Sequence, residues 1–157
     1  MSVTIRGFLN SDLDALHQIT IDSFAAVSFD QMVESRFGIL GGHDWRWRKA
    51  QQIDADVAAN APGIFIAEEE GKILGYITTT IDRDANKGRI PNMAVVSAAR
   101  GKGVGRQLLQ HALEYFRSEE LAFAVIETMD GNEAGKHLYP SCGFVEISRQ
   151  IQYAMKL

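Results

Sequence analysis

The chain of 157 residues carries a formal net charge of −4 at pH 7, and 46% of its residues are apolar and 23% charged. This length and composition predict one domain over residues 1–157 with its own hydrophobic core, and the acidic balance without a long basic run disfavours nucleic-acid partners. No apolar run is long enough to span a bilayer, and residues 1–6 lack the apolar core of a signal peptide. We therefore expect a soluble, cytoplasmic protein with no membrane partner.

Cysteine and histidine are sparse. Cys142 is the single cysteine, which excludes a disulfide within the chain, and the four histidines are scattered along the sequence. Neither residue type recurs at the spacing of metal ligands, so we expect no metal site.

The first 62 residues predict one strand followed by helices. Residues 3–8 alternate apolar and polar side chains and then meet Asn10-Ser11-Asp12, a typical start of a helix. Apolar residues at helical spacing then predict three helices: one from about residue 13, a short one ending before Gly38, and one that begins near Trp45 and ends near residues 60–63.

From residue 64 the apolar pattern changes to the alternation of strands. Residues 64–70 and 73–81, with a turn at Gly71-Lys72, predict a hairpin. The remaining elements are predicted in this order: a strand at 89–96, a helix through Val104, Leu108, Ala112 and Phe116, a strand at 122–127, a helix from Asn132 to about Cys142, and closing strands at 144–147 and 150–155. The fold class is therefore α/β (α+β), a mixed, mostly antiparallel central sheet of about seven strands flanked by helices.

A glycine-rich segment, Arg100-Gly101-Lys102-Gly103-Val104-Gly105-Arg106, joins the strand at 89–96 to the next helix. Alternate glycines let a backbone approach a ligand closely, and the start of a helix directs its N–H groups and positive dipole end at an anion. The cations Arg100, Lys102 and Arg106 crowd a helix start that disfavours positive charge, and a bound phosphate would resolve this conflict. A plain glycine turn with solvated basic residues remains open at this point.

Two common nucleotide-binding motifs fit this segment poorly. Gly101, Gly103 and Gly105 form G-x-G-x-G, whereas a dinucleotide fold needs G-x-G-x-x-G. A P-loop needs Gly-Lys followed by serine or threonine, and here Lys102 is followed by Gly103.

The segment resembles the pyrophosphate loop of the GNAT superfamily of N-acetyltransferases, R/Q-x-x-G-x-G/A, which residues 100–105 match at each fixed position. A second signature of that family, N-x-x-A-x-x-L-Y followed by G-F, resembles residues 132–139 and Gly143-Phe144, with Gly135 where alanine is usual. The glycine weakens the helix by about 1 kcal/mol relative to alanine. The resemblance covers roughly residues 63–150 and implies an acetyltransferase fold.

The resemblance implies that acetyl-coenzyme A is the cofactor. Its pyrophosphate would lie on the backbone N–H groups of the glycine-rich segment and its pantetheine arm along the fourth strand, and the implied cofactor-binding residues are Met93, Ala94, Val95, Arg100, Gly101, Lys102, Gly103, Val104, Gly105, Arg106, Asn132 and Tyr139. Pro91 has no N–H, so it interrupts strand pairing and could open the sheet for that arm.

The resemblance also implies two catalytic residues. Tyr139 holds the family position of the general acid that protonates the coenzyme thiolate, although a tyrosine that packs a helix on the sheet is the ordinary alternative. Glu127 ends the fifth strand and is our candidate for the general base, directly or through a water. Asn92 stands near where other branches of the family place a glutamate, and it cannot serve as a base.

The expected function is transfer of an acetyl group to a primary amine of a small-molecule or peptide acceptor, directly within a ternary complex. A non-catalytic module that binds acyl-coenzyme A is the alternative. The resemblance also admits a homodimer. On the acceptor side, Trp45 and Trp47 are two residues apart, so on a helix they point to nearly opposite sides and cannot both face one pocket. We expect one of them to be core; the other could line the acceptor site or also pack in the core.

Overall fold

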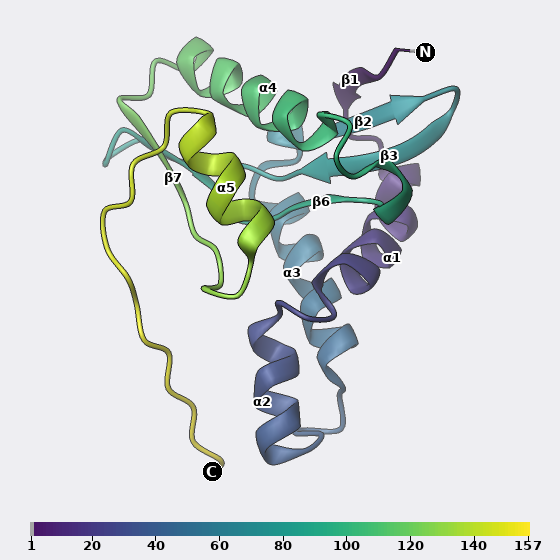
Figure 1. The fold of residues 1–157 in the computed structure, drawn as a ribbon, viewed down its shortest axis with the longest axis vertical. Coiled ribbons are helices and arrows are strands. Elements are labelled where there is room, and N and C mark those ends of the chain that lie inside the picture. Colours follow the sequence, from purple (N-terminus) through teal and green to yellow (C-terminus); the bar gives the residue numbers. More distant parts are fainter. Residues whose placement is uncertain (1) are drawn as a thin grey trace.

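The structure is a computed structural model that describes residues 2–157 (Figure 1). Within this range the helices are α1 (Leu13–Phe24), α2 (Phe29–Phe37), α3 (Trp45–Asn60), α4 (Val104–Ser118) and α5 (Glu133–Ser141). The strands are β1 (Thr4–Gly7), β2 (Phe65–Glu69), β3 (Lys72–Ile77), β4 (Thr80–Asp82), β5 (Lys87–Ile90), β6 (Met93–Val95) and β7 (Phe123–Ile126).

The strands form two sheets, and the chain passes from one sheet to the other between β3 and β4 and again between β5 and β6. One sheet has the order β1-β2-β3-β6 and is antiparallel throughout; the other has the order β4-β5-β7, in which β4 and β5 are antiparallel and β5 and β7 are parallel. Only Thr78-Thr79 separates β3 from β4, and only Pro91-Asn92 separates β5 from β6. The predicted fold class, mixed and mostly antiparallel with helices on its faces, is confirmed.

The closing strands predicted at 144–147 and 150–155 are wrong. Residues 144–157 contain no strand and leave the upper end of α5 as an extended segment, yellow in Figure 1. Alternating apolar side chains suit a strand, but a strand also needs a neighbour for its backbone N–H and C=O groups, and this segment has none among residues 2–157. The strand count still reaches seven because the predicted strands at 73–81 and 89–96 are each divided in two.

The core has two layers, one on each face of the sheets. Alternate residues of β2 and β3 point to opposite faces, so that Phe65, Ala67 and Ile77 pack beneath α4, whereas Ile64, Ile66 and Tyr76 pack against α1 and α3. The predicted stripe of α4 is confirmed, since its four members Val104, Leu108, Ala112 and Phe116 are all buried.

One glycine is required by close packing beneath α4. A Cβ atom at Gly88 of β5 would lie 2.6 Å from the ring of Phe116. The second sheet can therefore approach α4 closely only with glycine at this position. Within residues 2–157, none of the helices combines the length and apolar character that a bilayer span requires.

Candidate active site

The two sheets separate at Pro91. β5 and β7 pair as far as Ile90 and Ile126, and the next residue in the β5 segment is Pro91, which has no N–H to donate. Beyond it the chain continues as β6, which pairs with β3 and, within residues 2–157, with no strand on its other side. The expectation that Pro91 interrupts strand pairing is confirmed, and β6 presents an unpaired edge beyond the break.

The open edge of β6 carries backbone groups of Met93 and Val95. The N–H of Thr78 donates to the C=O of Asn92 and the N–H of Val96 donates to the C=O of Leu74, both at 2.8 Å, so residues 92 and 96 face β3. Backbone direction alternates along a strand, and residues 93 and 95 therefore face the open edge. This edge can bind an extended ligand as an added strand would bind.

The glycine-rich segment turns sharply into α4. Gly101 has φ +74° and Gly103 φ +82°, values that favour glycine, and Gly103 is the N-cap of α4 without a side-chain hydrogen bond. The first helical bond runs from the Gln107 N–H to the Gly103 C=O at 3.0 Å. The N–H groups of helical residues 104 to 106 therefore have no carbonyl acceptor within the helix, and they point out of its N-terminal end.

The three cations of this segment differ in their partners. Arg100 donates from Nε to the C=O of Val95 at 3.0 Å, and Arg106 donates to Ser141 Oγ at 2.9 Å and to Cys142 Sγ at 3.4 Å. Arg106 thus holds the end of α5, where its charge complements the negative end of the helix dipole. Lys102 is exposed and lines a hollow of about 530 Å³ that extends toward β1, together with Glu69 and Gln107.

Helix α5 begins with a cap that the sequence motif anticipates. Asn132 Oδ1 accepts from the Gly135 N–H at 3.2 Å, and its Nδ2 donates to Thr128 Oγ1 at 2.9 Å. A Cβ atom at Gly135 would lie 2.8 Å from Asn132 Nδ2 and 3.0 Å from Tyr139 Cε2. The departure from the family's alanine at 135 therefore makes room for the side chains of Asn132 and Tyr139.

Tyr139 is half-buried on α5. Its ring lies edge to face with that of Phe144, with centroids 6.3 Å apart, and its C=O accepts from the Phe144 N–H at 3.1 Å. Burial raises the pKa of the Tyr139 phenol. The phenol therefore carries its proton at neutral pH, as a donor must.

α4, α5 and β6 converge at Gly105. A Cβ atom at that residue would lie 3.4 Å from Leu138 Cδ2, 3.8 Å from Val95 Cγ2 and 3.9 Å from Met93 Cε. The glycine-rich segment, the Tyr139 helix and the open edge of β6 therefore meet at one place in the molecule.

Glu127 follows β7 where the two sheets part. Its carboxylate is 3.4 Å from Arg89 Nε on β5, and its side chain is 70% exposed. It is accessible to a solvent-borne acceptor, and a surface ion pair of this kind holds it only weakly.

A buried polar network on the α3 side was not anticipated from the sequence. Lys49 Nζ donates to Asn92 Oδ1 at 2.9 Å, Asn92 Nδ2 donates to Asp56 Oδ2 at 2.7 Å, and Thr78 Oγ1 donates to the same carboxylate oxygen at 2.7 Å. All four residues are buried. Burial lowers the pKa of Lys49 and raises that of Asp56.

A signal for this network does exist in the sequence. Lys49 and Asp56 occupy the same stripe of α3 as Trp45 and Ile53, at spacings of three and four residues. Two charged residues within an apolar stripe indicate a buried pair. Lys49 Nζ also lies 4.0 Å from the centre of the Phe24 ring, so that α1 helps to enclose it.

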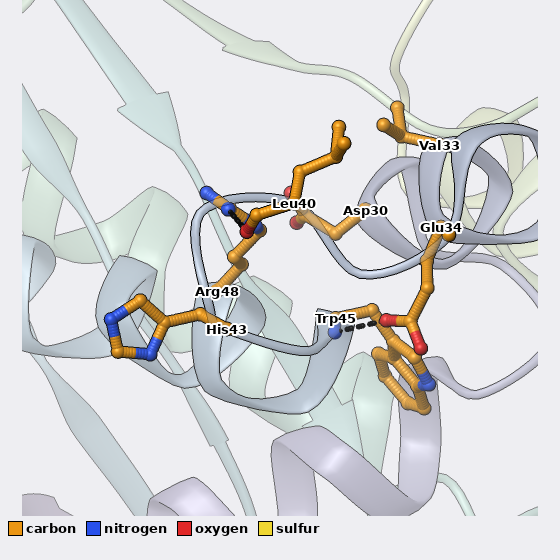
Figure 2. A pocket seen from close by; sticks show the side chains of 8 residues that line it. Asp30, Val33, Glu34, Leu40, His43, Trp45 and Arg48 are labelled. Atoms are coloured by element: carbon orange, nitrogen blue, oxygen red, sulfur yellow. Dashed lines mark hydrogen bonds between the residues drawn. The ribbon is translucent and has the colours of Figure 1, made fainter. Parts of the chain in front are cut away.

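Side chains of α2, of the loop after it and of the start of α3 pack closely around a small hollow (Figure 2). Glu34 accepts a hydrogen bond from the Trp45 N–H, and Arg48 donates to the C=O of Leu40. The small hollow that these residues line has a volume of about 10 Å³, room for one water molecule at most. Trp45 is core and Trp47 is exposed and stacked on His43, as the two-residue spacing predicts.

Within residues 2–157, no group of three or more histidine, cysteine, aspartate or glutamate side chains is placed to hold a metal ion. The candidate site consists of the open β6 edge, the start of α4, and the side chains of Tyr139 and Glu127.

A mixed sheet that opens at a proline, with a glycine-rich turn into a helix beside the opening, defines an acetyltransferase fold. A sequence profile of the acetyltransferase (GNAT) family matches residues 15–144, and the chain belongs to this family. The resemblance drawn from the two sequence motifs is confirmed.

Known proteins of several kinds are similar to the chain. A mycothiol acetyltransferase of Thermomonospora curvata is 26% identical over 109 residues, which are 69% of this chain and 36% of that protein. The N-alpha-acetyltransferase 30 of Saccharomyces cerevisiae is 28% identical over 111 residues, 69% of this chain and 58% of that protein. The chain thus spans about a third to three fifths of the length of these two relatives.

Solved structures share the fold at low identity. The PaiA N-acetyltransferase of Thermoplasma acidophilum, in complex with coenzyme A, has a TM-score of 0.77 and 19% identity over 96% of this chain and 94% of that one. The ribosomal-protein-S18-alanine N-acetyltransferase of Escherichia coli has a TM-score of 0.69 and 20% identity, over 94% of this chain and 80% of that one.

Proposed function

We propose that the chain is an acetyl-coenzyme A-dependent N-acetyltransferase that acts by direct transfer on a primary amine of a small-molecule or peptide acceptor. The observation that carries the proposal is the convergence of three elements at Gly105, namely β6 with an open edge, the uncapped start of α4, and the helix of Tyr139. Family membership, and the coenzyme A bound by the PaiA structure, support the same cofactor.

The backbone of this chain fits such a cofactor. The N–H groups of residues 104–106 suit a pyrophosphate, because they lie at a helix start without a side-chain cap. The edge groups of Met93 and the N–H of Val95 suit the amides of a pantetheine arm, whereas the Val95 C=O already accepts from Arg100 Nε. An N–H at this edge also suits the oxygen of a thioester carbonyl. Lys102 would add charge from its side chain, whereas Arg106 would act through its N–H, since its guanidinium binds Ser141.

Tyr139 is proposed as the general acid. When bound, acetyl-coenzyme A supplies an acetyl group as a thioester whose sulfur leaves as a thiolate. The phenol of Tyr139 keeps its proton until negative charge develops on that sulfur, and then donates it as the C–S bond breaks. Asn132 positions the helix of Tyr139 through its cap and is itself proposed to contact the cofactor.

Glu127 is proposed as the general base. It accepts one proton from the acceptor ammonium, directly or through a water, so that the neutral amine can form the new N–C bond. The second N–H proton leaves to solvent as the amide forms and balances the proton that Tyr139 gives to the thiolate. Its exposed position at the end of β7 is compatible with acceptors of different size. The single domain over residues 1–157 and the cytoplasmic location stay predictions.

An acceptor screen tests the proposal. The purified chain is incubated with acetyl-coenzyme A and a panel of peptide N-termini, lysine peptides, polyamines, amino sugars and small amines, and free thiol is measured. Amine-dependent thiol release that is lost in the Tyr139→Phe variant is the expected result. Calorimetric binding of coenzyme A without turnover on any amine would instead favour the alternative, a non-catalytic module that binds acyl-coenzyme A.

A further inference from the structure

Arg89 and Glu127 lie on the same face of the sheet β4-β5-β7. A Cβ atom at Gly88 would lie 2.6 Å from the ring of Phe116 on α4, so the next residue of β5, Arg89, points to the opposite face. On β7, Ile126 packs on the α4 side, so that Glu127 also points away from α4. The two side chains meet there, with Arg89 Nε 3.4 Å from Glu127 Oε1.

This pair is open to solvent and loosely held. The side chains of Arg89 and Glu127 are 45% and 70% exposed, and their separation exceeds that of a tight charge-assisted hydrogen bond, which is about 2.8 Å. Within residues 2–157 this is the one ion pair of Arg89, and its two Nη groups donate to no other group in that range. Arg89 therefore has two Nη groups available for a ligand directly beside the proposed general base.

Other charged side chains near the break are bonded within the protein. Arg100 donates to a backbone carbonyl of β6, and Arg106 donates to side chains at the end of α5. Lys49 donates to two side-chain amide oxygens. Asp130 is paired with Lys136 at 3.1 Å. Arg89 differs from these residues because it is held by a single loose contact, and that contact is with Glu127.

Two opposite charges held side by side match an acceptor that carries both charges. An α-amino acid has its ammonium and its carboxylate on one carbon, so its ammonium can donate to Glu127 while its carboxylate accepts from Arg89. The planar guanidinium binds a carboxylate through two parallel hydrogen bonds. A lysine side chain within a peptide, a polyamine or a peptide N-terminus has no carboxylate beside its amine, and each would leave the Nη groups of Arg89 unused.

We propose that Arg89 is a specificity-determining residue that binds the carboxylate of the acceptor, and that the acceptor is a free amino acid. On binding, this carboxylate replaces Glu127 as the partner of Arg89, and Glu127 becomes available to the ammonium. The carboxylate takes no part in the reaction and serves to hold the amine beside the proposed base. The inference rests on the proposed function and narrows its acceptor from primary amines in general to amino acids.

Matched acceptors test the inference. A panel of amino acids and their α-amides is incubated with the chain and acetyl-coenzyme A, and kcat and KM are measured from the release of free thiol. The two acceptors of each pair differ only in the carboxylate. Hydrogen bonds to a charged group contribute about 10–100-fold. For the amino acid that reacts fastest, we therefore expect kcat/KM to exceed that of its amide by this factor.

Three variants assign the preference to the guanidinium. Arg89→Met removes the charge and should abolish the preference for the acid over the amide, chiefly through a higher KM for the acid, whereas a merely structural role would affect both acceptors alike. Arg89→Lys keeps the charge without the paired donors and should retain part of the preference. The matched control is Lys87→Met, which removes a charge from the same face of β5 two residues farther from the break and should retain all of it.

Circular dichroism establishes that each variant remains folded. An amide, a polyamine or a peptide that reacts as well as the best amino acid overturns the inference and leaves the proposed N-acetyltransferase activity standing. A preference for the acid that persists in Arg89→Met also overturns it. Absence of turnover on every amine, amino acids included, contradicts the proposed function itself and the inference with it.

Discussion

Polar groups on the two sides of the break at Pro91 differ in whether they have hydrogen-bond partners within the protein. On the α4 and α5 side, backbone groups of β6 and the start of α4 face outward without partners in the secondary structure. On the α3 side, the side chains of Lys49, Asn92, Asp56 and Thr78 are buried and bonded to one another. Unpaired groups suit a ligand, whereas a closed network fixes the break in the sheet against which that ligand would bind.

The difference also separates two carboxylates near the break. Asp56 is buried and bonded on the α3 side, and burial raises its pKa. Glu127 is exposed at the end of β7 and paired only with Arg89. Variants at these positions should therefore act on different quantities, stability for Asp56 and turnover for Glu127.

The largest effect is expected from Asp56→Ala. Removal of the carboxylate leaves two buried donors, Asn92 Nδ2 and Thr78 Oγ1, without their acceptor, which costs about 1–3 kcal/mol of unfolding free energy for each donor. Urea unfolding measures the loss. The matched control is Asp54→Ala on the same helix, whose partner His17 lies in a partly exposed pair at 2.8 Å, and about 0–1 kcal/mol is expected there. Equal losses in the two variants would show that the buried network contributes little.

The same network predicts a pH dependence of stability. The folded-state pKa of Asp56 lies above its ordinary value of 3.8, so the folded chain binds more protons than the unfolded chain between these two values. The contribution of Asp56 to stability therefore falls as pH rises through that window. Asp56→Asn should remove this slope, and the difference between wild-type and variant unfolding free energies across acid pH measures it. A constant difference contradicts the assignment.

On the other side of the break, Tyr139→Phe is expected to lower kcat about 100-fold, because loss of a general acid costs about 10²–10⁴-fold. The Kd of coenzyme A should stay within about twofold, since the ring and its contact with Phe144 remain. Steady-state kinetics and calorimetry measure the two quantities. Tyr115→Phe removes only a hydroxyl that accepts from Asn60 at 3.3 Å, and full turnover is expected in that control.

Glu127→Gln is expected to lower kcat about tenfold and to flatten the acid limb of the pH–rate profile, because the amide cannot accept the ammonium proton. The control is Glu133→Gln on α5, another exposed carboxylate, which is paired with Lys136 at 3.6 Å. Its profile should match the wild type. An acid limb that persists in Glu127→Gln assigns the proton to another acceptor.

The α4 and α5 side of the break could be predicted from the sequence, because a site made of backbone groups requires residues with distinctive backbone conformations. Gly101, Gly103 and Pro91 are visible in the sequence, and the positive φ angles and the break in pairing follow from them. The α3 network escaped prediction because it depends on side chains brought together from three separate segments, α3, Thr78 and Asn92. The closing strands failed for a related reason, since alternation predicts which face is apolar but not which neighbour covers it.

The smallest effect is expected from Gly135→Ala, and its sign separates helix propensity from site geometry. Alanine favours a helix by about 1 kcal/mol over glycine. The added Cβ, however, would lie 2.8 Å from Asn132 Nδ2 and 3.0 Å from Tyr139 Cε2, closer than either side chain tolerates unmoved. Both side chains belong to the proposed site, so we expect kcat to fall about threefold while unfolding free energy changes by less than about 1 kcal/mol. A stabilised variant with full turnover would mean that Asn132 and Tyr139 shift without cost, and that the glycine at 135 is not needed to position the acid.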